Sequence, residues 1–406
     1  RLGRGAWGGM AVLCWGRGED GQLGLGDTND QHSPVFVEGL HGRVVVQIAC
    51  GSGHTVALTG AGEVYSWGRG DDGRLGHGDN GWKYIPKLVE FFVGRRVRSV
   101  TCGSYHTAAI SEEGQLFTWG GGMFGKLGHG TEAGHSLPHC VQALTAKRVE
   151  QVACGSRHTV ALLATGEVYT WGDRENGVCG HGLIEGHQYL PREVEGLSGV
   201  RVVQVAACGF HTAALTDAGE VHSFGDGKFG RLGHGTEQSQ GTPRLVEGLV
   251  GTRIVQVACG GFHTAAISDQ GHTYTWGGGE HGQLGHGDRK NKMSPCLVER
   301  LRDVPMGVVT CGWSHTGGLD QQGLVWTWGN GDHGKLGHAD AKKVTQPRVV
   351  DQLRHHRVCV VGSYNEHTAV LTAPDSASCA TLMSVRYRSE MRGMVDNPEF
   401  SDVTFM

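Results

Sequence analysis

Cysteine and histidine recur in this chain at a spacing that could support nucleophilic catalysis. Cys102 and His106 stand close together, and a histidine beside a cysteine can take its proton and leave a nucleophilic thiolate. The arrangement is repeated along the chain, with cysteines before a His-Thr pair at Cys50, Cys102, Cys154, Cys208, Cys259 and Cys311. An active site needs one polarised environment rather than six copies of one pair. The pattern favours small buried cysteines in strands, and it predicts no catalytic residue.

A second set of histidines has the residue type of a zinc ligand. They follow glycine in a recurring glycine-rich loop, at His77, His129, His181, His234, His286 and His338. Zinc ligands converge to within about 2.1 Å of one point, which one histidine per repeat of a ring cannot do. We therefore predict no metal and no cofactor. The loop histidines are expected to be half-buried and to hydrogen bond to loop carbonyls, and the His-Thr pairs to bridge strands through their side chains.

These motifs belong to a repeat of 52 or 53 residues. A Trp-Gly pair, or Phe-Gly in one unit, recurs at Trp15, Trp67, Trp119, Trp171, Phe224, Trp276 and Trp328. Glycine accounts for 70 of the 406 residues and stands at fixed offsets, which indicates many tight turns rather than disorder. A fixed period of this length indicates one repeat architecture. The seven units run over roughly 12–61, 62–113, 114–165, 166–218, 219–270, 271–322 and 323–373.

One unit contains four short segments with strand character. In the second unit they are residues 62–67, 86–90, 97–102 and 106–110, separated by glycine and proline turns. Four strands per unit match one blade of a β-propeller. We predict an all-β fold, a seven-bladed β-propeller with four short antiparallel strands per blade. An open solenoid is the alternative, but it would need distinctive capping repeats, and the terminal units are almost as regular as the others.

Sequence outside the repeats divides the chain further. We expect a leader over 1–11, the propeller over 12–373, a linker over 374–394 and the start of a second domain over 395–406, in a piece of a longer protein. No signal peptide opens the chain, and no apolar run is long enough to span a membrane. The net charge of −4 argues against direct binding to nucleic acid or to a membrane. Reduced thiols favour the cytoplasm, the nucleus or both.

The derived unit resembles the regulator-of-chromosome-condensation (RCC1) repeat. The resemblance rests on Trp-Gly, Gly-x-Leu-Gly-His-Gly, a proline, Val-Cys-Gly and His-Thr, and it covers residues 12–373. The patterns of kelch and WD40 repeats, which have a similar period, do not recur. Residues 397–405, Asn-Pro-Glu-Phe-Ser-Asp-Val-Thr-Phe, resemble the opening of a BTB/POZ domain. The resemblance implies an RCC1-like propeller followed by the start of a BTB/POZ domain.

These resemblances imply a non-enzymatic protein-interaction scaffold. BTB domains often dimerise and bind cullin-3, so the propeller would recruit substrates as part of a ubiquitin ligase adaptor. The alternative is a guanine-nucleotide exchange factor or a binding partner for a small GTPase, as for the founding member of the family. That protein inserts a β-wedge into its repeats, for which intervals of 52 or 53 residues leave no room. Ultraviolet perception, known for a plant member, uses several Gly-Trp-Arg-His-Thr motifs, whereas this chain has one related segment, Gly312–Thr316.

Candidate partner-binding residues lie where the repeats differ. We expect the turns before His-Thr and the loops after Trp-Gly to form rings on the propeller faces, the first mixed aromatic and polar, the second largely acidic. Aromatic residues and arginine are common anchors of protein interfaces, although ordinary solvated turns are the alternative. The candidates before His-Thr are Tyr105, Arg157, Phe210, Phe262, Trp313 and Glu366. Those after Trp-Gly are Asp71, Asp72, Asp173, Glu175, Asp226, Glu280 and Asp332.

Overall fold

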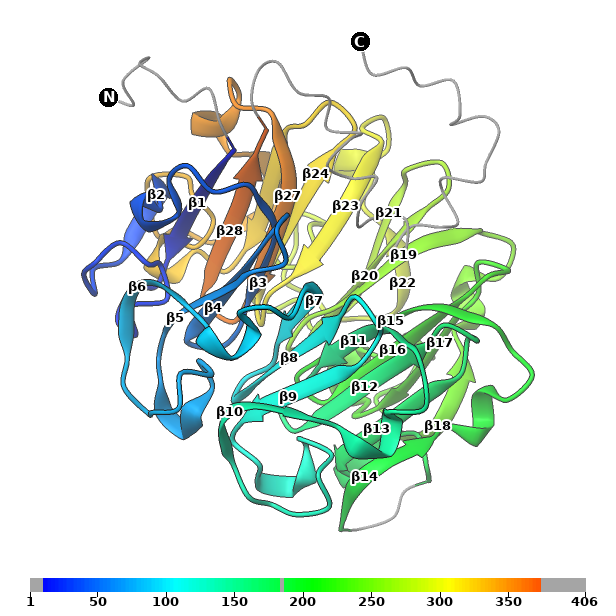
Figure 1. Ribbon diagram of the computed structural model, residues 1–406. Helices are drawn as coiled ribbons and strands as arrows, with labels where there is room; N and C mark the ends of the chain where they lie inside the picture. Colours follow the sequence, from blue (N-terminus) through cyan, green and yellow to red (C-terminus); the bar gives the residue numbers. More distant parts are fainter. Residues whose placement is uncertain (1–9, 183–185, 374–406) are drawn as a thin grey trace, which may run out of the picture.

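The protein folds into seven four-stranded antiparallel sheets arranged as the blades of a propeller (Figure 1). The structure, a computed structural model, describes residues 10–182 and 186–373. Within these ranges all regular elements are strands and short 3-10 helices, and no helix is long and apolar enough to cross a membrane. The predicted fold class is confirmed. The expected linker at 374–394 and the segment 395–406 lie outside the described residues, as does the expected leader as far as residue 9.

Each blade contributes one strand to each of four concentric positions. The innermost strands are β3 (Val45–Cys50), β7 (Val97–Cys102), β11 (Val149–Cys154), β15 (Val202–Cys208), β19 (Ile254–Cys259), β23 (Met306–Cys311) and β27 (Val358–Tyr364). The second strands are β4 (His54–Thr59), β8 (His106–Ser111), β12 (His158–Leu163), β16 (His211–Thr216), β20 (His263–Ser268), β24 (His315–Asp320) and β28 (His367–Thr372).

The third and outermost strands complete the blades. The third strands are β5 (Val64–Gly68), β9 (Leu116–Gly120), β13 (Val168–Asp173), β17 (Val221–Gly225), β21 (Thr273–Gly277), β25 (Val325–Gly329) and β1 (Ala11–Gly16). The outermost strands are β6 (Lys83–Leu88), β10 (His135–Cys140), β14 (His187–Glu193), β18 (Gln240–Leu245), β22 (Lys292–Leu297), β26 (Val344–Val349) and β2 (Gln31–Phe36). We number the blades 1 to 7 from the blade of β3 to the blade of β27.

Short 3-10 helices lie in two of the connections. The loops between third and outermost strands contain η2 (Asp71–Gly73), η4 (Met123–Gly125), η6 (Glu175–Gly177), η8 (Lys228–Gly230) and η11 (Asp332–Gly334). The connections between blades contain η1 (Glu38–Leu40), η3 (Glu90–Phe92), η5 (Gln142–Leu144), η7 (Glu195–Leu197), η9 (Glu247–Leu249), η10 (Glu299–Leu301) and η12 (Asp351–Leu353).

The ring closes through blade 7, which takes strands from both ends of the described chain. β1 pairs with β28 in an antiparallel register from Ala11 opposite Thr372 to Gly16 opposite His367. The innermost strand β27 also packs against β3 of blade 1. Every blade is thus a complete four-stranded sheet with a neighbouring blade on either side, and an open solenoid is excluded.

The sequence repeat and the structural blade are out of phase by two strands. The four strands predicted within residues 62–113 are all present, as β5, β6, β7 and β8. However, β5 and β6 belong to blade 1, whereas β7 and β8 belong to blade 2. Each repeat unit therefore joins two blades, and the inter-blade contacts are built into the repeat itself.

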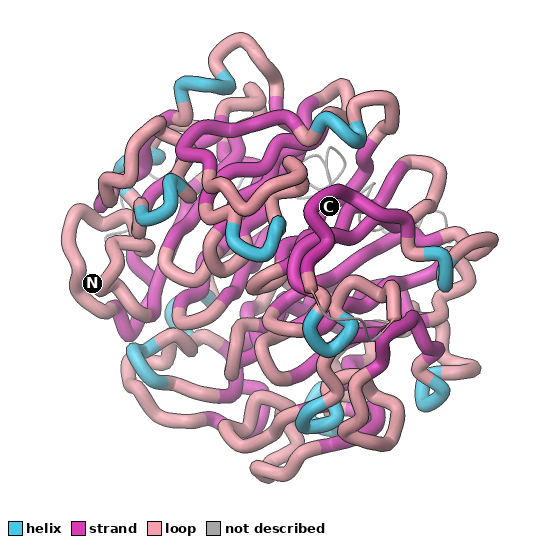
Figure 2. The backbone as a smooth tube through the Cα atoms, turned by 90° about the horizontal axis from the view of Figure 1, so that it is seen from below, coloured by secondary structure: helices cyan, strands magenta, loops and turns pink. Residues whose placement is uncertain are grey.

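Strand direction divides the connections between two faces of the propeller. Because neighbouring strands are antiparallel, the turns between the innermost and second strands emerge on the same face as the loops between the third and outermost strands. We call this the loop face (Figure 2 gives a second view of the ring). The backbone N–H of Arg69, in a loop, donates to the carbonyl of Gly53, in a turn, at 2.7 Å. The remaining turns and the inter-blade connections form the opposite face.

A tryptophan and a glycine fix the contact between neighbouring blades. Trp67 is fully buried, and its Nε1 donates to the carbonyl of Gln22 in the loop of the preceding blade, at 2.9 Å. Gly76 has a positive φ of 80°, and a Cβ there would lie 2.8 Å from Nε1 of Trp119 in the next blade. Glycine is required at this position for both reasons.

The His-Thr pairs form a ring of hydrogen bonds from blade to blade. Thr55 Oγ1 donates to the Gln22 carbonyl at 2.7 Å, so it accepts from His367 Nε2 at 2.9 Å. The bonds between the other blades join His54 to Thr107, His106 to Thr159, His158 to Thr212, His211 to Thr264, His263 to Thr316 and His315 to Thr368. The expected bridging role is confirmed, and it links whole blades.

Candidate protein-interaction face

The repeated cysteines and loop histidines are part of the packing and hydrogen bonding that hold the blades together. Cys102 is buried, its Sγ donates to the carbonyl of Ala49, and burial raises its pKa well above the ordinary value, so the reactive thiolate is disfavoured. His77 is half-buried, and its Nε2 bonds to the hydroxyl of Ser66 at 3.0 Å. The expected loop carbonyl, that of Leu75, instead accepts from this hydroxyl at 2.6 Å. In the described part of the chain no cluster of histidine, cysteine, aspartate or glutamate could hold a metal ion.

Both sets of candidate partner-binding residues lie on the loop face, where they interleave. Arg157, from the turn between β11 and β12, lies 3.3 Å from Asp173 and 3.3 Å from Glu175 in the adjoining loop of its own blade. Tyr105 is exposed, whereas Asp173 is buried. The two expected rings are thus a single surface.

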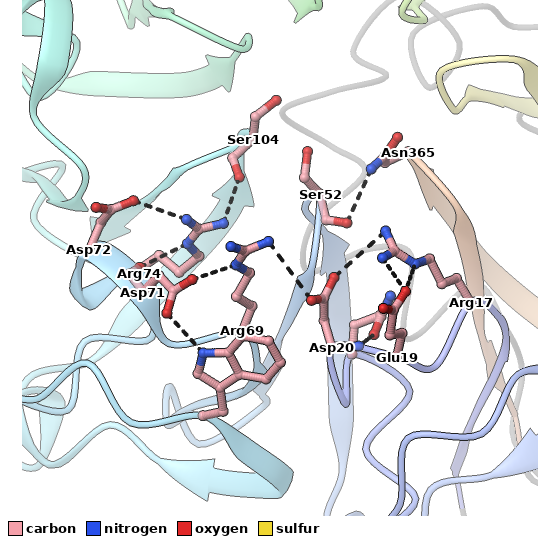
Figure 3. A network of polar contacts seen from close by, with 12 residues as sticks. Arg17, Glu19, Asp20, Ser52, Arg69, Asp71, Asp72, Arg74, Ser104 and Asn365 are labelled. Atoms are coloured by element: carbon pink, nitrogen blue, oxygen red, sulfur yellow. Dashed lines mark hydrogen bonds and ion pairs between the residues drawn. The ribbon is translucent and has the colours of Figure 1, made fainter.

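A network of charges joins blades 7 and 1 on this face (Figure 3). Asp20 lies 3.9 Å from both Arg17 and Arg69, and Arg69 bonds to Asp71 at 2.6 Å. Asp71 also accepts from Nε1 of Trp82 at 2.9 Å, and this bond and the arginine lower its pKa. Burial raises the pKa of Asp20 despite the two arginines near it. This part of the face is polar, and its charged side chains are paired with one another.

Beneath the loop face lies a set of buried cations that sequence reasoning missed. They occupy the variable position between glycine and leucine of the loop motif, and each has a fractional exposure of 2% or less: Arg74, Lys126, Arg231 and Lys335. The backbone carbonyl of this residue accepts from a threonine of the next blade, as Thr107 Oγ1 does to Arg74 at 2.8 Å. The side chain is therefore held against the neighbouring turn, where Arg74 Nη1 donates to the Ser104 carbonyl at 3.1 Å.

Aromatic rings alternate with these cations across blades 2 and 3. The ring of Tyr105 lies between Arg74, at 5.2 Å, and Lys126, at 5.9 Å. The ring of Phe124 lies between Lys126, at 5.8 Å, and Arg157, at 4.8 Å. Distances under about 6 Å from charge to ring centre are typical of cation–π contacts. The contacts orient the aromatic side chains on the face.

The row of aromatic residues continues into blades 4 to 6. Arg157 also lies 5.5 Å from the ring of Phe210. Arg231 lies 5.6 Å from Phe229 and 5.7 Å from Phe262, whose ring contacts that of Trp313 edge-on at 5.8 Å between centroids. We call Tyr105, Phe124, Phe210, Phe229, Phe262 and Trp313 the aromatic arc. Four of its members were candidates from the sequence. Phe124 and Phe229 belong to the variable loops after Trp-Gly but were not among the candidates, and they have positive φ within those loops.

The acidic candidates lie mostly beside cations of the same face. Asp72 pairs with Arg74 at 3.0 Å and Asp226 lies 3.7 Å from Arg231, while Glu366 pairs with Lys335. Glu175, Glu280 and Asp332 are exposed on the face. The described loop face is of mixed charge, since the buried cations offset much of the acidity seen in the loops.

Tyr364 closes the centre of the loop face. It belongs to blade 7, yet its hydroxyl lies 3.2 Å from Ser104 Oγ in blade 2 and it also bonds to Cys208 of blade 4. Ser104 Oγ in turn donates to Ser156 Oγ in blade 3 at 3.0 Å. Three residues before the histidine, five of the other repeats have glycine and one has Cys208, whereas the last repeat has a tyrosine. That difference was the signal available in the sequence.

This architecture defines a class, the seven-bladed propeller built from a tryptophan- and glycine-marked repeat. The chain belongs to the RCC1-like domain family, whose profile matches residues 11–377. It is 36% identical to the ultraviolet-B receptor UVR8 of Arabidopsis thaliana over 347 residues, which cover 85% of this chain and 78% of the receptor. It is 41% identical to the human E3 ubiquitin-protein ligase HERC2 over 321 residues, 78% of this chain but only 6% of the ligase.

Solved structures share the fold. Prp20p of Saccharomyces cerevisiae, described with its binding to Gsp1p and histones, superposes with a TM-score of 0.81 at 22% identity, over 93% of this chain and 95% of that one. At this identity the similarity supports the fold alone.

Proposed function

We propose that this protein is a non-enzymatic interaction scaffold that binds a protein partner through its loop face. The observation that carries the proposal is the aromatic arc. Tyr105, Phe229 and the adjoining Met123 are 48%, 37% and 62% exposed, and they stand beside arginines and lysines. Ordinary solvated turns are built from glycine, aspartate, asparagine and serine. Exposed aromatic residues, methionine and arginine are instead enriched at protein interfaces.

Two of the compared proteins are described by what they bind or do. Prp20p binds Gsp1p and histones, and HERC2 is a ubiquitin ligase of which this chain matches a small part. Photoreception is not proposed, although UVR8 is a relative. The tryptophan of the Gly-Trp-x-His-Thr segment occurs here in one unit, at Trp313.

A matched pair of surface variants tests the proposal. Tyr105→Glu and Phe229→Glu place charge on the loop face, while Val93→Glu and Val250→Glu do so on the opposite face, where the valines are 63% and 66% exposed. Cross-linked partners of each variant are quantified in cells by mass spectrometry. We expect one set of proteins to be lost from both loop-face variants and kept by both controls. Loss only from the opposite-face controls contradicts the proposal.

The finer proposal is a ubiquitin ligase adaptor of the cytoplasm or nucleus. It is supported by the resemblance of residues 397–405 to the start of a BTB/POZ domain, which would dimerise and bind cullin-3. The test is co-purification of cullin-3 with the natural full-length protein and with a form ending at residue 394. Cullin-3 bound only by the longer form supports the adaptor role. Equal binding by both forms, or binding by neither, contradicts it.

Guanine-nucleotide exchange is the alternative proposal. It is supported by membership of the RCC1-like family and opposed by the regular repeat, which contains no inserted wedge. Release of a fluorescent nucleotide from a panel of small GTPases distinguishes the two. Acceleration for one GTPase that is abolished by Tyr105→Glu supports exchange through the loop face, and no acceleration for any member rejects exchange.

A further inference from the structure

Lys126 differs from the other buried cations of the loop face in the charge around it. Its Nζ donates to the Met123 carbonyl at 3.1 Å, and no carboxylate of the described residues forms an ion pair with it. The other three cations at this repeat position are each paired within the chain: Arg74 with Asp72, Arg231 with Asp226 and Lys335 with Glu366. Lys126 is thus a buried ammonium with no ion pair of its own, and Asp72 and Glu132 favour its charge only from beyond ion-pair distance.

Comparison between repeats explains the imbalance. Each of the three paired cations has its carboxylate at a different place in the repeat. The carboxylate stands two residues before Arg74, five residues before Arg231, and, for Lys335, just before the His-Thr pair of the next blade. Around Lys126 these places are occupied by Phe124, Gly121 and Arg157. An aromatic ring, a residue without a side chain and a second cation replace the three possible acids.

The surroundings of Lys126 make an unbalanced charge costly. The residue is 2% exposed and lies between the rings of Tyr105 and Phe124. Burial of an ammonium without a counter-charge is unfavourable, and here it lowers the pKa of Lys126 to about 8. Tyr105 and Met123, which lie nearest the solvent, are 48% and 62% exposed, and Met123 is unbranched and adapts easily. The ammonium therefore lies under a cover that can move.

We propose that Lys126 binds the carboxylate of an aspartate or glutamate in an acidic segment of the partner protein, with a neighbouring apolar residue of that segment against Tyr105 and Met123. This inference rests on the proposed protein-binding function. The partner's acid completes the ion pair that three other blades make internally. Because aromatic rings exclude water there, the pair contributes more to affinity than an exposed ion pair would.

A peptide selection on the whole 406-residue chain tests the inference. The probe is a random-sequence peptide library displayed on phage. We expect enriched peptides to share one aspartate or glutamate beside an apolar residue. The Kd of the best peptide should rise about tenfold or more for Lys126→Met, and much less for Lys228→Met, which removes an exposed lysine of the same face. Lys126→Arg, which keeps the charge, should retain most of the binding.

A double-mutant cycle separates a direct contact from a structural effect. Changing the peptide's acid to its amide should weaken binding to the native chain by about the same factor, and weaken binding to Lys126→Met no further. Additive losses, peptides enriched without an acidic position, or no enriched peptide each overturn the inference. Partners lost from Tyr105→Glu in cells would still support the proposed function in those cases, whereas partners unaffected by every loop-face variant would reject that function itself.

Discussion

Acidification from pH 7.5 to pH 5 should unfold the propeller through its ring of His-Thr bonds. The seven histidines are fully buried, and burial lowers the pKa of each: to about 4 for His158 and to about 3 for His263 and His367. In the unfolded chain an imidazole titrates near pH 6.5. As the pH falls, these histidines therefore become protonated in the unfolded chain while they stay neutral in the folded ring. The contribution of these neutral histidines to the free energy of unfolding is complete above about pH 6.5 and is lost as the pH falls below that value.

The expected loss is large because seven groups contribute. Keeping one imidazole neutral at pH 5 costs about 2 kcal/mol, at about 1.4 kcal/mol per pH unit below its unfolded pKa. Seven such groups cost about 14 kcal/mol, which is comparable to the whole stability of an ordinary folded domain. Carboxylates do not explain a loss in this window. The pKa of Asp71, for example, is lowered, so its contribution is lost only as the pH falls below the ordinary range of aspartate.

The assay is urea unfolding between pH 5 and pH 8, followed by the fluorescence of the buried tryptophans. His263→Gln keeps an N–H group for Thr316 but cannot be protonated near pH 6, so it should reduce the loss between pH 7.5 and pH 5 by about 2 kcal/mol. His355→Gln, at an exposed position, is the control and should leave the loss unchanged. A urea midpoint that is the same at pH 5 and pH 7.5 would refute the reasoning.

Three further outcomes are expected. Gly76→Ala should lower the free energy of unfolding by about 2–4 kcal/mol, and Gly94→Ala by only about 1 kcal/mol, as measured by urea unfolding. Both glycines have φ of +80°, but only at position 76 would the new Cβ clash with a neighbouring side chain. Thiol reagents should label the partly exposed Cys296 in the folded protein and leave Cys208 unlabelled, since burial raises the pKa of Cys208 to about 12. Mass spectrometry locates the label, and rapid labelling of Cys208 would contradict its burial. Trp15→Phe should lower the melting temperature by the equivalent of about 1–3 kcal/mol, because the smaller ring leaves a void at a fully buried position and the Lys335 carbonyl loses one of its two donors. An unchanged melting temperature would argue against both effects.

The fold could be predicted because the same pattern of four strands recurs in seven repeats along the chain. Alternating character at 62–67 and the glycine turns around it identify β5, and the His-Thr pair marks the start of β8. The phase of the blades could not be predicted. A periodic sequence has no intrinsic origin, and only the pairing of β1 with β28 sets one.

The candidate site was predictable in part. Variable turns pointed to Tyr105 and Phe262, which do lie on one face. Lys126 escaped notice because a lysine in a glycine-rich loop is normally solvated. Its burial depends on a contact with the next blade, which no local pattern encodes. The positive φ of Phe124, which turns its ring toward Lys126, was equally hidden, since that conformation is uncommon outside glycine.

The register of the closing strands also determines how the ring responds to tension. Ala11 and Thr372 are paired at the same end of β1 and β28, so the chain enters and leaves the propeller side by side, on the face away from the aromatic arc. Ala11 and Thr372 are therefore the two points at which a force along the chain would act on the ring. A pulling force between them would load the hydrogen bonds of this pair one at a time, as in unzipping, instead of together. Blade 7 is therefore the place where the ring would open mechanically.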